Sequence, residues 1–121
     1  MKNISFALTT DQVRARTKTV TRRFGWWNVK PGDVLMACEK CQGLKPGEPL
    51  VRLGRIRVRS VMRERLNEIG DHLNDVAKEG FPGMSPADFV AMFCGHMKGV
   101  TPDTFINRIE FEYLDGENED R

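Results

Sequence analysis

Alternating apolar and charged residues predict three strands along this chain. The clearest runs from residue 51 to residue 61, with Ile56 and Val58 on one face and a row of arginines on the other: Arg55, Arg57 and Arg59. A second alternation over residues 105–113 predicts a half-buried strand, and residues 4–8 predict a short first strand. The arginine row is typical of a solvent-facing strand surface, and a surface that contacts RNA phosphates is the alternative.

Apolar residues at helical spacing predict helices between these strands. A short helix begins at Thr9–Asp11, where a hydroxyl or carboxylate can cap free backbone N–H groups, and ends near Arg16. A second helical region is interrupted by Gly70, which favours two short helices, and its apolar positions are Leu66, Ile69, Leu73 and Val76. Gly80 is a natural C-terminal cap for this region, which leaves Glu79 at its last turn.

The segment from Ser85 to Met97 predicts a further, amphipathic helix. Ser85 is followed by Pro86, and a serine cap with proline at the first helical position is a common helix start. One face of this helix carries Phe89, Met92, Phe93 and His96. We expect it to cover part of the sheet, with His96 semi-buried.

Proline and glycine positions predict where the chain turns. Lys30–Asp33 contains Pro31-Gly32, and the apolar residues 34–37 that follow predict a buried strand. The glycine- and proline-rich segment 38–49 predicts a hairpin loop. Strands at the beginning, middle and end of the chain, with helices inserted between them, favour a small α+β barrel over a doubly wound parallel sheet.

Length and charge narrow the organisation to one domain. We expect the 121-residue chain to fold over residues 1–114, because residues 115–121 are mostly acidic, lack apolar side chains and are typical of a disordered tail. The net charge of +2, from 19 basic and 17 acidic residues, is too small for a protein that coats or packages DNA. Basic residues concentrate between Arg14 and Arg65, which favours a local anion site.

Hydropathy and cysteine content predict a cytoplasmic protein. No apolar run approaches the roughly 18–20 residues that a membrane helix needs, and the first residues lack the apolar core of a signal peptide. Three cysteines, an odd number, argue against the disulfide scaffold of a secreted protein and fit a reducing compartment. We therefore expect no membrane contact.

The most distinctive segment is a basic, hydroxyl-rich run at residues 16–23. It holds four cations, Arg16, Lys18, Arg22 and Arg23, together with three threonines, and Trp26 and Trp27 follow it. Arginine and lysine can neutralise phosphate, threonine can donate to or attack a polar group, and exposed aromatic rings can stack on a base. A nucleotide or RNA fragment has the matching features; a solvated strand edge with packing tryptophans is the alternative.

Cysteines and histidines offer a second candidate site. Cys38 and Cys41 form a Cys-x-x-Cys pair, and Cys94 with His96 would complete a four-ligand zinc site. Cys94 lies on an apolar helix face and not in a second tight knuckle, so we expect unligated thiols and no cofactor. Neither His96 nor His72 sits beside an obvious nucleophile, so a Ser-His-Asp hydrolase is not supported.

A lysine and a threonine of the basic run can also carry chemistry. A lysine in a partly desolvated pocket has a lowered pKa and can act as a base, and a nearby threonine hydroxyl is then a nucleophile. Lys18 and Thr21 fit these roles, and an acid such as Glu79 can donate or relay a proton. Spacing along the sequence does not bring Glu79 to Lys18, so this triad is one combination among many.

Several segments together resemble the ASCH domain family. The likeness covers residues 4–114 and rests on Lys18-Thr19-Val20-Thr21-Arg22, Lys30-Pro31-Gly32-Asp33-Val34-Leu35, Val58-Arg59-Ser60-Val61 and Arg108-Ile109-Glu110-Phe111-Glu112-Tyr113. The Lys-Thr-x-Thr-Arg segment and the Pro-Gly-Asp turn are its most specific parts. The resemblance implies a PUA-like β-barrel with inserted helices, and phage and bacterial proteins of this longer form look similar.

The resemblance also implies roles for three residues. Some small ASCH proteins are amidohydrolases that remove acyl groups from N4-acetylcytidine, and their catalytic Lys, Thr and Glu match Lys18, Thr21 and Glu79 by motif and chain order. These positions imply Thr21 as nucleophile, Lys18 as its base and Glu79 as proton relay or orienter. Arg22 or Arg23 would hold the ribose or phosphate end of the substrate.

Two other functions stay open at this point. The first is an RNA-binding or RNA-cleaving ASCH module, in which the strand arginines or Arg22 and Arg23 contact phosphates and Trp26 or Trp27 stacks on a base. The second is an accessory domain with packing tryptophans and a vestigial pocket. Hydrolysis of N4-acetylcytidine distinguishes the enzyme, and salt-dependent RNA affinity distinguishes the binding module.

Overall fold

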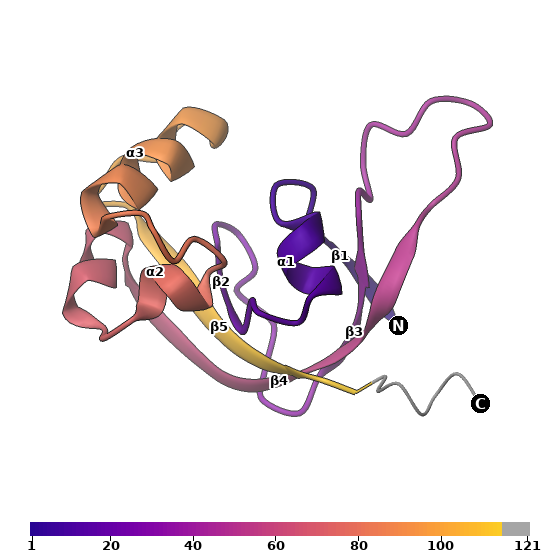
Figure 1. Cartoon of the computed structure of the whole chain (residues 1–121), viewed down its shortest axis with the longest axis horizontal. Coiled ribbons are helices and arrows are strands. Elements are labelled where there is room, and N and C mark those ends of the chain that lie inside the picture. Colours follow the sequence, from indigo (N-terminus) through magenta and orange to yellow (C-terminus); the bar gives the residue numbers. More distant parts are fainter. Residues whose placement is uncertain (115–121) are drawn as a thin grey trace.

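Five strands form one mixed, curled sheet in the computed structural model, which describes residues 1–114 (Figure 1). The strands are β1 (Lys2–Ser5), β2 (Val20–Arg23), β3 (Val34–Cys38), β4 (Arg52–Arg65) and β5 (Phe105–Tyr113). Their order across the sheet is β1-β3-β4-β5-β2; β1 runs parallel to β3, and the other neighbours are antiparallel. The sheet has the shape of a half-barrel, which confirms the predicted α+β class. The predicted acidic tail, residues 115–121, lies outside the described residues.

The helices lie on the concave side of this sheet. Helix α1 (Thr10–Arg14) follows β1, while the 3₁₀ helix η1 (Leu66–Asp71), α2 (Asp75–Lys78) and α3 (Pro86–His96) come between β4 and β5 and gather at one end of the molecule (Figure 1). The predicted serine cap of α3 is confirmed, because Ser85 Oγ accepts from the Asp88 amide at 3.1 Å. No side chain caps α1 at Thr9, so the capping prediction there is wrong. None of the helices within residues 1–114 is long and apolar enough to cross a bilayer.

Two predicted strands have different bounds in the structure. The first strand ends at Ser5 because its pairing with β3 stops there, and Phe6 turns out of the sheet to accept a hydrogen bond from the Thr9 amide at 3.1 Å. The central strand continues to Arg65 because β5 pairs with it from Ile56 to Arg65, where the partner is Phe105. The hydropathy pattern did not predict this extension, because the end of the strand is rich in charged residues.

The apolar side chains form two cores. The first lies between the sheet and α1 and contains Ile4, Phe6, Val13, Leu35, Ala37, Ile56, Val58, Ile109 and Phe111. The second lies under α2, α3 and η1 and contains Leu66, Ile69, Val76, Phe89, Val100 and Ile106. Leu73 was predicted among these and is 84% exposed, because the chain leaves the helical path between η1 and α2, where Asn74 takes a positive φ of 61°.

The sheet is open between its two edge strands. In the described part of the chain, β1 and β2 lie at opposite ends of the strand order and share no backbone pairing. One side chain spans the gap: Arg23 of β2 donates through Nη2 to the carbonyl of Ser5 on β1 at 2.7 Å. This seam is therefore the place where the barrel leaves room for a ligand.

Candidate active site

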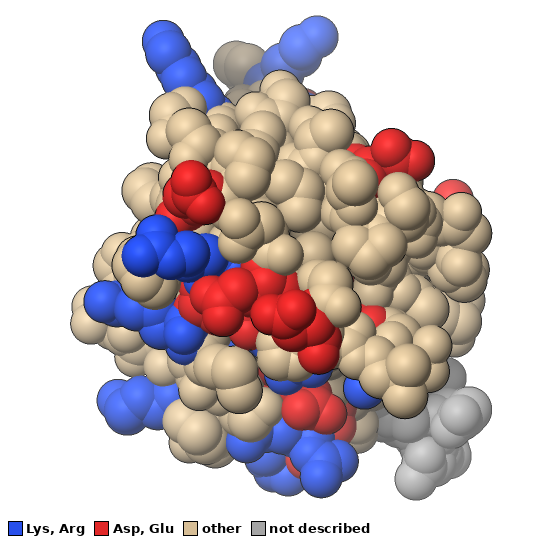
Figure 2. Space-filling model, turned by 90° about the vertical axis from the view of Figure 1, so that its left-hand side faces the viewer, with Lys and Arg blue, Asp and Glu red and all other residues tan. Residues whose placement is uncertain are grey.

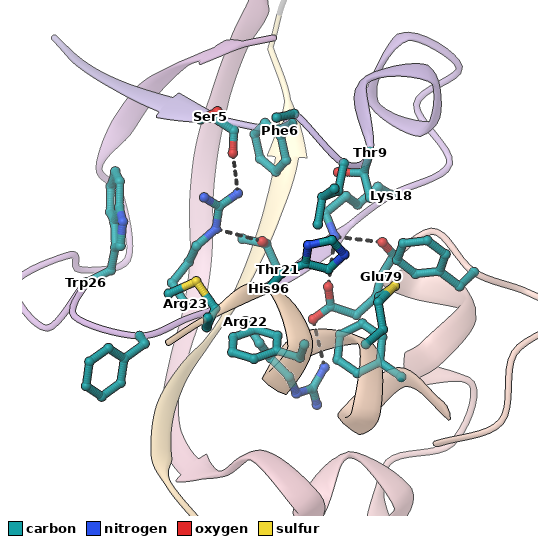
Figure 3. Close-up of a pocket in the computed structure, with 18 residues that line it drawn as sticks. Ser5, Phe6, Thr9, Lys18, Thr21, Arg22, Arg23, Trp26, Glu79 and His96 are labelled. Carbon is teal, nitrogen blue, oxygen red and sulfur yellow. Dashed lines mark hydrogen bonds and ion pairs between the residues drawn. The ribbon is translucent and has the colours of Figure 1, made fainter. Parts of the chain in front are cut away.

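A pocket of about 290 Å³ lies at the seam between β1 and β2 (Figure 3). Its polar side is lined by Lys18, Thr21, Arg23 and Glu79. Its apolar side comes mainly from α3 and the turn before it, with Phe81, Phe89, Met92, Phe93 and Met97. The volume is at the lower end of the roughly 300–1,000 Å³ that is common for ligand pockets. It therefore suits one ligand of about nucleoside size.

The alternation of β2 divides the basic run between two environments. Successive side chains of a strand point to opposite faces, so Thr21 and Arg23 share one face while Arg22 takes the other. Thr21 and Arg23 meet directly, since Arg23 Nε donates to Thr21 Oγ1 at 3.0 Å. The candidate nucleophile thus has a guanidinium as its immediate neighbour.

Lys18 and Glu79 form a buried ion pair. Lys18 Nζ donates to Glu79 Oε1 at 2.8 Å and to the Glu79 backbone carbonyl at 2.6 Å. Each side chain is 4% exposed. Backbone contacts hold the two segments together, because the Thr19 amide donates to the Lys78 carbonyl at 2.9 Å. The convergence of Lys18 and Glu79, which spacing along the sequence could not establish, is present in the fold.

Glu79 is placed by the end of α2. It follows the last helical residue, Lys78, and Gly80 then takes a positive φ of 109°, as the predicted glycine cap requires. The Gly80 carbonyl accepts from Gln12 Nε2 of α1 at 3.1 Å. The helix end is therefore anchored to α1, and the Glu79 carboxylate is directed back toward the basic run.

Thr21 lines the same pocket but makes a different hydrogen bond. Within residues 1–114, Thr21 Oγ1 is bonded to Arg23 and not to Lys18, whose contacts go to Glu79. Figure 3 shows the Lys18 amine, Thr21 and Glu79 grouped at one side of the pocket. The predicted triad is thus gathered in one place, with the Lys18–Glu79 link formed.

A layer of buried charges lies beneath the pocket. Arg22 donates to three carboxylates: Glu79 Oε2 at 3.1 Å, Glu64 Oε2 at 3.0 Å and Asp75 Oδ2. Asp75 also accepts two hydrogen bonds from Arg108, from Nε and Nη2, each at 2.9 Å. Because the Arg22 side chain is fully enclosed and occupied by these partners, it supports Glu79 from below.

Burial and charge shift the pKa values of three groups in this region. Burial lowers the pKa of Lys18, against the opposing charge and hydrogen bond of Glu79, and Arg23 and Arg22 lower it further. Burial also lowers the pKa of Arg23 to about 10. Burial raises the pKa of Asp75, but hydrogen bonds from Arg108 and Arg22 outweigh it and bring the value to about 2.

Of the predicted ligand-binding residues Trp26, Trp27 and Arg16, one lies at the pocket and two lie outside it. Trp26 lines the pocket, where the Lys2 ammonium lies 4.5 Å from its ring centroid. Trp27 is 39% exposed and lies outside the pocket, with the Arg63 guanidinium 4.4 Å from its ring. Arg16 is exposed and stacks on Tyr113 at 5.3 Å. Of these three residues, only Trp26 can contact a ligand in the pocket.

The arginines of β4 lie away from the pocket. Ile56 and Val58 are each 1% exposed while Arg55, Arg57 and Arg59 face solvent, which confirms the predicted alternation. Two of these arginines share one carboxylate, because Glu112 lies 3.3 Å from Arg57 and 3.8 Å from Arg59. Their charge toward an outside ligand is therefore partly neutralised.

The predicted zinc ligands are not gathered. In the described residues no group of three or more His, Cys, Asp and Glu side chains is placed to hold a metal ion. Cys38 is buried, and its thiol donates to the Met36 carbonyl at 3.5 Å. Burial together with the neighbouring Cys41 raises the pKa of Cys38 to about 11. Cys94 and His96 are on α3, where His96 is exposed at the pocket and not semi-buried as predicted.

Sequence patterns missed the layer of buried charges around Arg22. Glu64, Asp75 and Arg108 are buried, although charged residues in a strand or a helix start normally face solvent. Arg108 is one of the charged residues in the alternation of β5, but its side chain is buried because it reaches Asp75 of α2. No local signal marks these three residues, because the partners that neutralise them come from other elements: Arg22 for Glu64 and Asp75, and Asp75 for Arg108.

Solved structures of other proteins match this fold over nearly the whole chain. A hypothetical protein, PH0355, superposes with a TM-score of 0.63 at 14% identity, over 93% of this chain and 96% of that one. Protein EF3133 from Enterococcus faecalis V583, of the family DUF984, superposes with a TM-score of 0.63 at 15% identity, over 100% of this chain and 82% of that one. An ASCH domain from Lactobacillus crispatus JV V101 superposes with a TM-score of 0.54 at 14% identity, over 93% of this chain and 78% of that one. No protein-family model and no curated protein matches the sequence.

These likenesses agree with the architecture built up from the strands. The sheet order, the half-barrel curvature and the helices inserted before the last strand are features of the chain itself. The structural matches extend over nearly all of residues 1–114. The chain therefore has the α+β half-barrel fold of ASCH domains.

Proposed function

We propose that this chain is an amidohydrolase that removes the acyl group from an N4-acylated cytidine or a closely related modified nucleoside. The observation that carries the proposal is the buried lysine: Lys18 is 3% exposed, lies in one pocket with Thr21 and is held by Glu79. Burying a lysine costs folding free energy, and use of its amine as a base is a functional reason for a protein to keep it. The ASCH-type fold and the matching Lys-Thr-x-Thr-Arg segment support the same assignment.

The chemistry runs in two halves. In the first, Thr21 Oγ attacks the acyl carbon while the neutral Lys18 amine takes the hydroxyl proton. The C–N bond then breaks, its electron pair leaves with N4, and N4 takes that proton from Lys18, so that an ester remains on Thr21. In the second half, water attacks the ester and gives its proton to Lys18. The C–O bond to Thr21 breaks, Thr21 recovers the proton, and the products are the nucleoside and a carboxylic acid.

Lys18 can act as a base only in its amine form. Burial makes this form accessible at lower pH than for an exposed lysine, because the charged form is poorly solvated there. Glu79 opposes this effect and also fixes the position of Nζ through its carboxylate and its backbone carbonyl. Glu79 therefore orients the base, and its carboxylate is the counter-ion of Lys18 when Lys18 becomes an ammonium.

The test is release of cytidine from N4-acetylcytidine, followed by chromatography from neutral to mildly alkaline pH. We expect Lys18→Ala and Thr21→Ala each to lower turnover by about 100-fold or more, since general-base catalysis alone contributes roughly 10²–10⁴-fold. Arg14→Gln is the matched control: Arg14 is a surface arginine paired with Glu39 at 2.6 Å and takes no part in the pocket. A wild-type protein that releases no cytidine over this pH range contradicts the proposal.

A second candidate is RNA binding on the outer face of the sheet. Two exposed aromatic rings each lie beside an arginine: the Arg63 guanidinium is 4.4 Å from the Trp27 ring centroid, and the Arg65 guanidinium is 4.4 Å from the Phe105 ring centroid. Such pairs suit single-stranded RNA, which combines phosphates with open bases. The face over α2 and α3 is less suited, since acidic side chains gather at its centre with basic ones beside them (Figure 2).

RNA binding makes a distinct prediction. Affinity for a short single-stranded RNA should fall steeply with salt, drop in Arg63→Ala and persist in Lys18→Ala. Hydrolysis of N4-acetylcytidine should show the opposite dependence on these two variants. Affinity that is independent of salt, or absent, contradicts the RNA-binding candidate.

A further inference from the structure

Among the cations around the pocket, Arg23 is the one that has no carboxylate partner within the described residues 1–114. Within residues 1–114, Lys18 pairs with Glu79, and Arg22 pairs with Glu64, Asp75 and Glu79. Arg108 pairs with Asp75 and, at 3.9 Å, with the partly exposed Glu110. The polar contacts of Arg23 are to Thr21 Oγ1 and the Ser5 carbonyl, which are both neutral oxygens. Its guanidinium also stacks on the Phe6 ring at 4.9 Å.

Within residues 1–114, the side chains that line or lie beneath the pocket carry a surplus of one cation when Lys18 is an ammonium. Three buried carboxylates, Glu64, Asp75 and Glu79, balance the three cations that they contact, Lys18, Arg22 and Arg108. Arg23 is a fourth cation beside this balanced group. His72, which contacts Glu64 at 2.7 Å, adds no negative charge. A cation that has lost water and has gained no counter-ion is stabilised by an incoming anion.

Burial has removed much of the hydration of Arg23. Its pKa falls to about 10 for this reason, and the more distant charges of Glu79 and Cys41 offset only part of the effect. In such surroundings an ionic hydrogen bond is stronger than in water. Arg23 would therefore gain more from an anionic ligand than Arg57 or Arg59 on the solvent face of β4.

The guanidinium is held with one nitrogen free. Nε and Nη2 are occupied by Thr21 and Ser5, and in the described residues Nη1 has no hydrogen-bond partner. No enclosed side-chain nitrogen or oxygen in that part of the chain lacks a partner, so Nη1 lies where solvent or a ligand can reach it. Figure 3 shows the Arg23 side chain between Trp26 and Thr21, at the edge of the pocket.

We propose that Arg23 binds an anionic group of the ligand, a phosphate or a carboxylate, so that this pocket takes a nucleotide-type anion in preference to a neutral nucleoside. The inference rests on the proposed function in taking this pocket as the ligand site, but it does not depend on hydrolysis. The aromatic and methionine side chains opposite then contact the apolar part of the same ligand. The pocket thus has a charged end at Arg23 and an apolar end at α3.

The test compares pairs of ligands in which one member carries an anionic group and the other is neutral. Calorimetry measures binding of cytidine and cytidine 5′-monophosphate, and of benzamide and benzoate, to the wild-type protein. We expect the anion of at least one pair to bind about tenfold or more tightly than its neutral partner, since hydrogen bonds to charged groups are among the stronger ones. Preference in the first pair indicates a phosphate group, and preference in the second indicates a carboxylate.

Variants assign the preference to Arg23. Arg23→Gln should abolish it, Arg23→Lys should keep a weakened form, and the surface control Arg14→Gln should leave it unchanged. Equal binding of anion and neutral partner in the wild type, or a preference that survives in Arg23→Gln, overturns the inference. If Arg23→Gln does not fold, Arg23→Lys with the wild-type ratios decides, because loss of the two-pronged guanidinium should still weaken the preference severalfold.

Hydrolysis separates this inference from the proposed function. A protein that prefers the monophosphate but removes no acetyl group from N4-acetylcytidine or from its 5′-phosphate supports the Arg23 site and contradicts the amidohydrolase. A protein that hydrolyses N4-acetylcytidine at least as well as its 5′-phosphate, with equal binding in both ligand pairs, supports the amidohydrolase and overturns the Arg23 site. The two failures are therefore distinguishable.

Discussion

Replacing Asp75 by asparagine tests whether the buried charges hold the site together. Asp75 is 1% exposed, and its carboxylate accepts hydrogen bonds from Arg22 and from two nitrogens of Arg108. The amide of asparagine has nearly the same shape but carries no charge, and its NH₂ group faces a guanidinium. Two buried arginines would lose a counter-ion at once.

Two independent arguments set the size of the effect. Removing one partner from a buried ion pair costs about 3–5 kcal/mol, because the remaining charge is left uncompensated. The pKa of Asp75, lowered from 3.8 to about 2, corresponds to about 2 kcal/mol of folding free energy. We therefore expect Asp75→Asn to lose at least about 2 kcal/mol. A domain of this size has a total stability of roughly 5–15 kcal/mol, so the loss is large.

The assay is urea denaturation followed by tryptophan fluorescence at several pH values. The folded-state pKa of Asp75 lies below its unfolded value, so the Asp75 carboxylate stabilises the fold above about pH 4 and loses this contribution as the pH falls toward 2. The difference in unfolding free energy between wild type and Asp75→Asn should be constant near neutral pH. It should shrink as the pH drops below about 4.

A matched variant separates this effect from loss of any ion pair. Glu112→Gln breaks the solvent-exposed pairs with Arg57 and Arg59 and should cost only about 0–1 kcal/mol. The reasoning is refuted if Asp75→Asn is no more destabilising than Glu112→Gln. A wild-type advantage that stays undiminished at low pH would also refute it.

The remaining predictions concern the pocket and the helix end that supplies Glu79. Glu79→Gln removes the charge that raises the pKa of Lys18, so the acidic limb of the kcat/KM profile should move to lower pH; an unchanged or raised limb contradicts this. Thr21→Ser keeps a hydroxyl beside Arg23 and should retain most turnover, whereas Thr21→Val should lose it; similar rates for the two variants would exclude Thr21 as nucleophile. Gly80→Ala should cost about 1–3 kcal/mol in urea denaturation, because alanine disfavours a φ of 109° and its Cβ would lie 3.0 Å from Gln12; a cost below that of Glu112→Gln contradicts this.

Local patterns predicted most of the secondary structure because their causes are local. The alternation around Ile56 and Val58, the serine at the start of α3 and the glycine after Glu79 all behave as their side-chain chemistry requires. The errors have non-local causes. Pairing with β5 extends β4 to Arg65, and a break before α2 exposes Leu73.

The candidate site shows the same division. The family resemblance of the segment around Lys18 and Thr21 pointed to a candidate site there, and Arg23 belonged to the same run. Whether Arg22 or Arg23 faces a ligand depends on which side of β2 meets the helices, and that follows from the pairing of β2 with β5. The structure places Arg22 in the charged layer beneath the pocket and Arg23 at its edge.

The sequence by itself determined the α+β class, the position of most helices and strands, and the residues in which acid-base chemistry is possible, because these follow from side-chain periodicity and local backbone preference. Only the tertiary structure decided which charges neutralise one another. Glu79 follows Lys18 by 61 residues along the chain, and Asp75 meets Arg108 across 33, so their partners are set by strand order and not by spacing. In the part of the chain that the structure describes, these pairings leave Arg23 without a carboxylate partner.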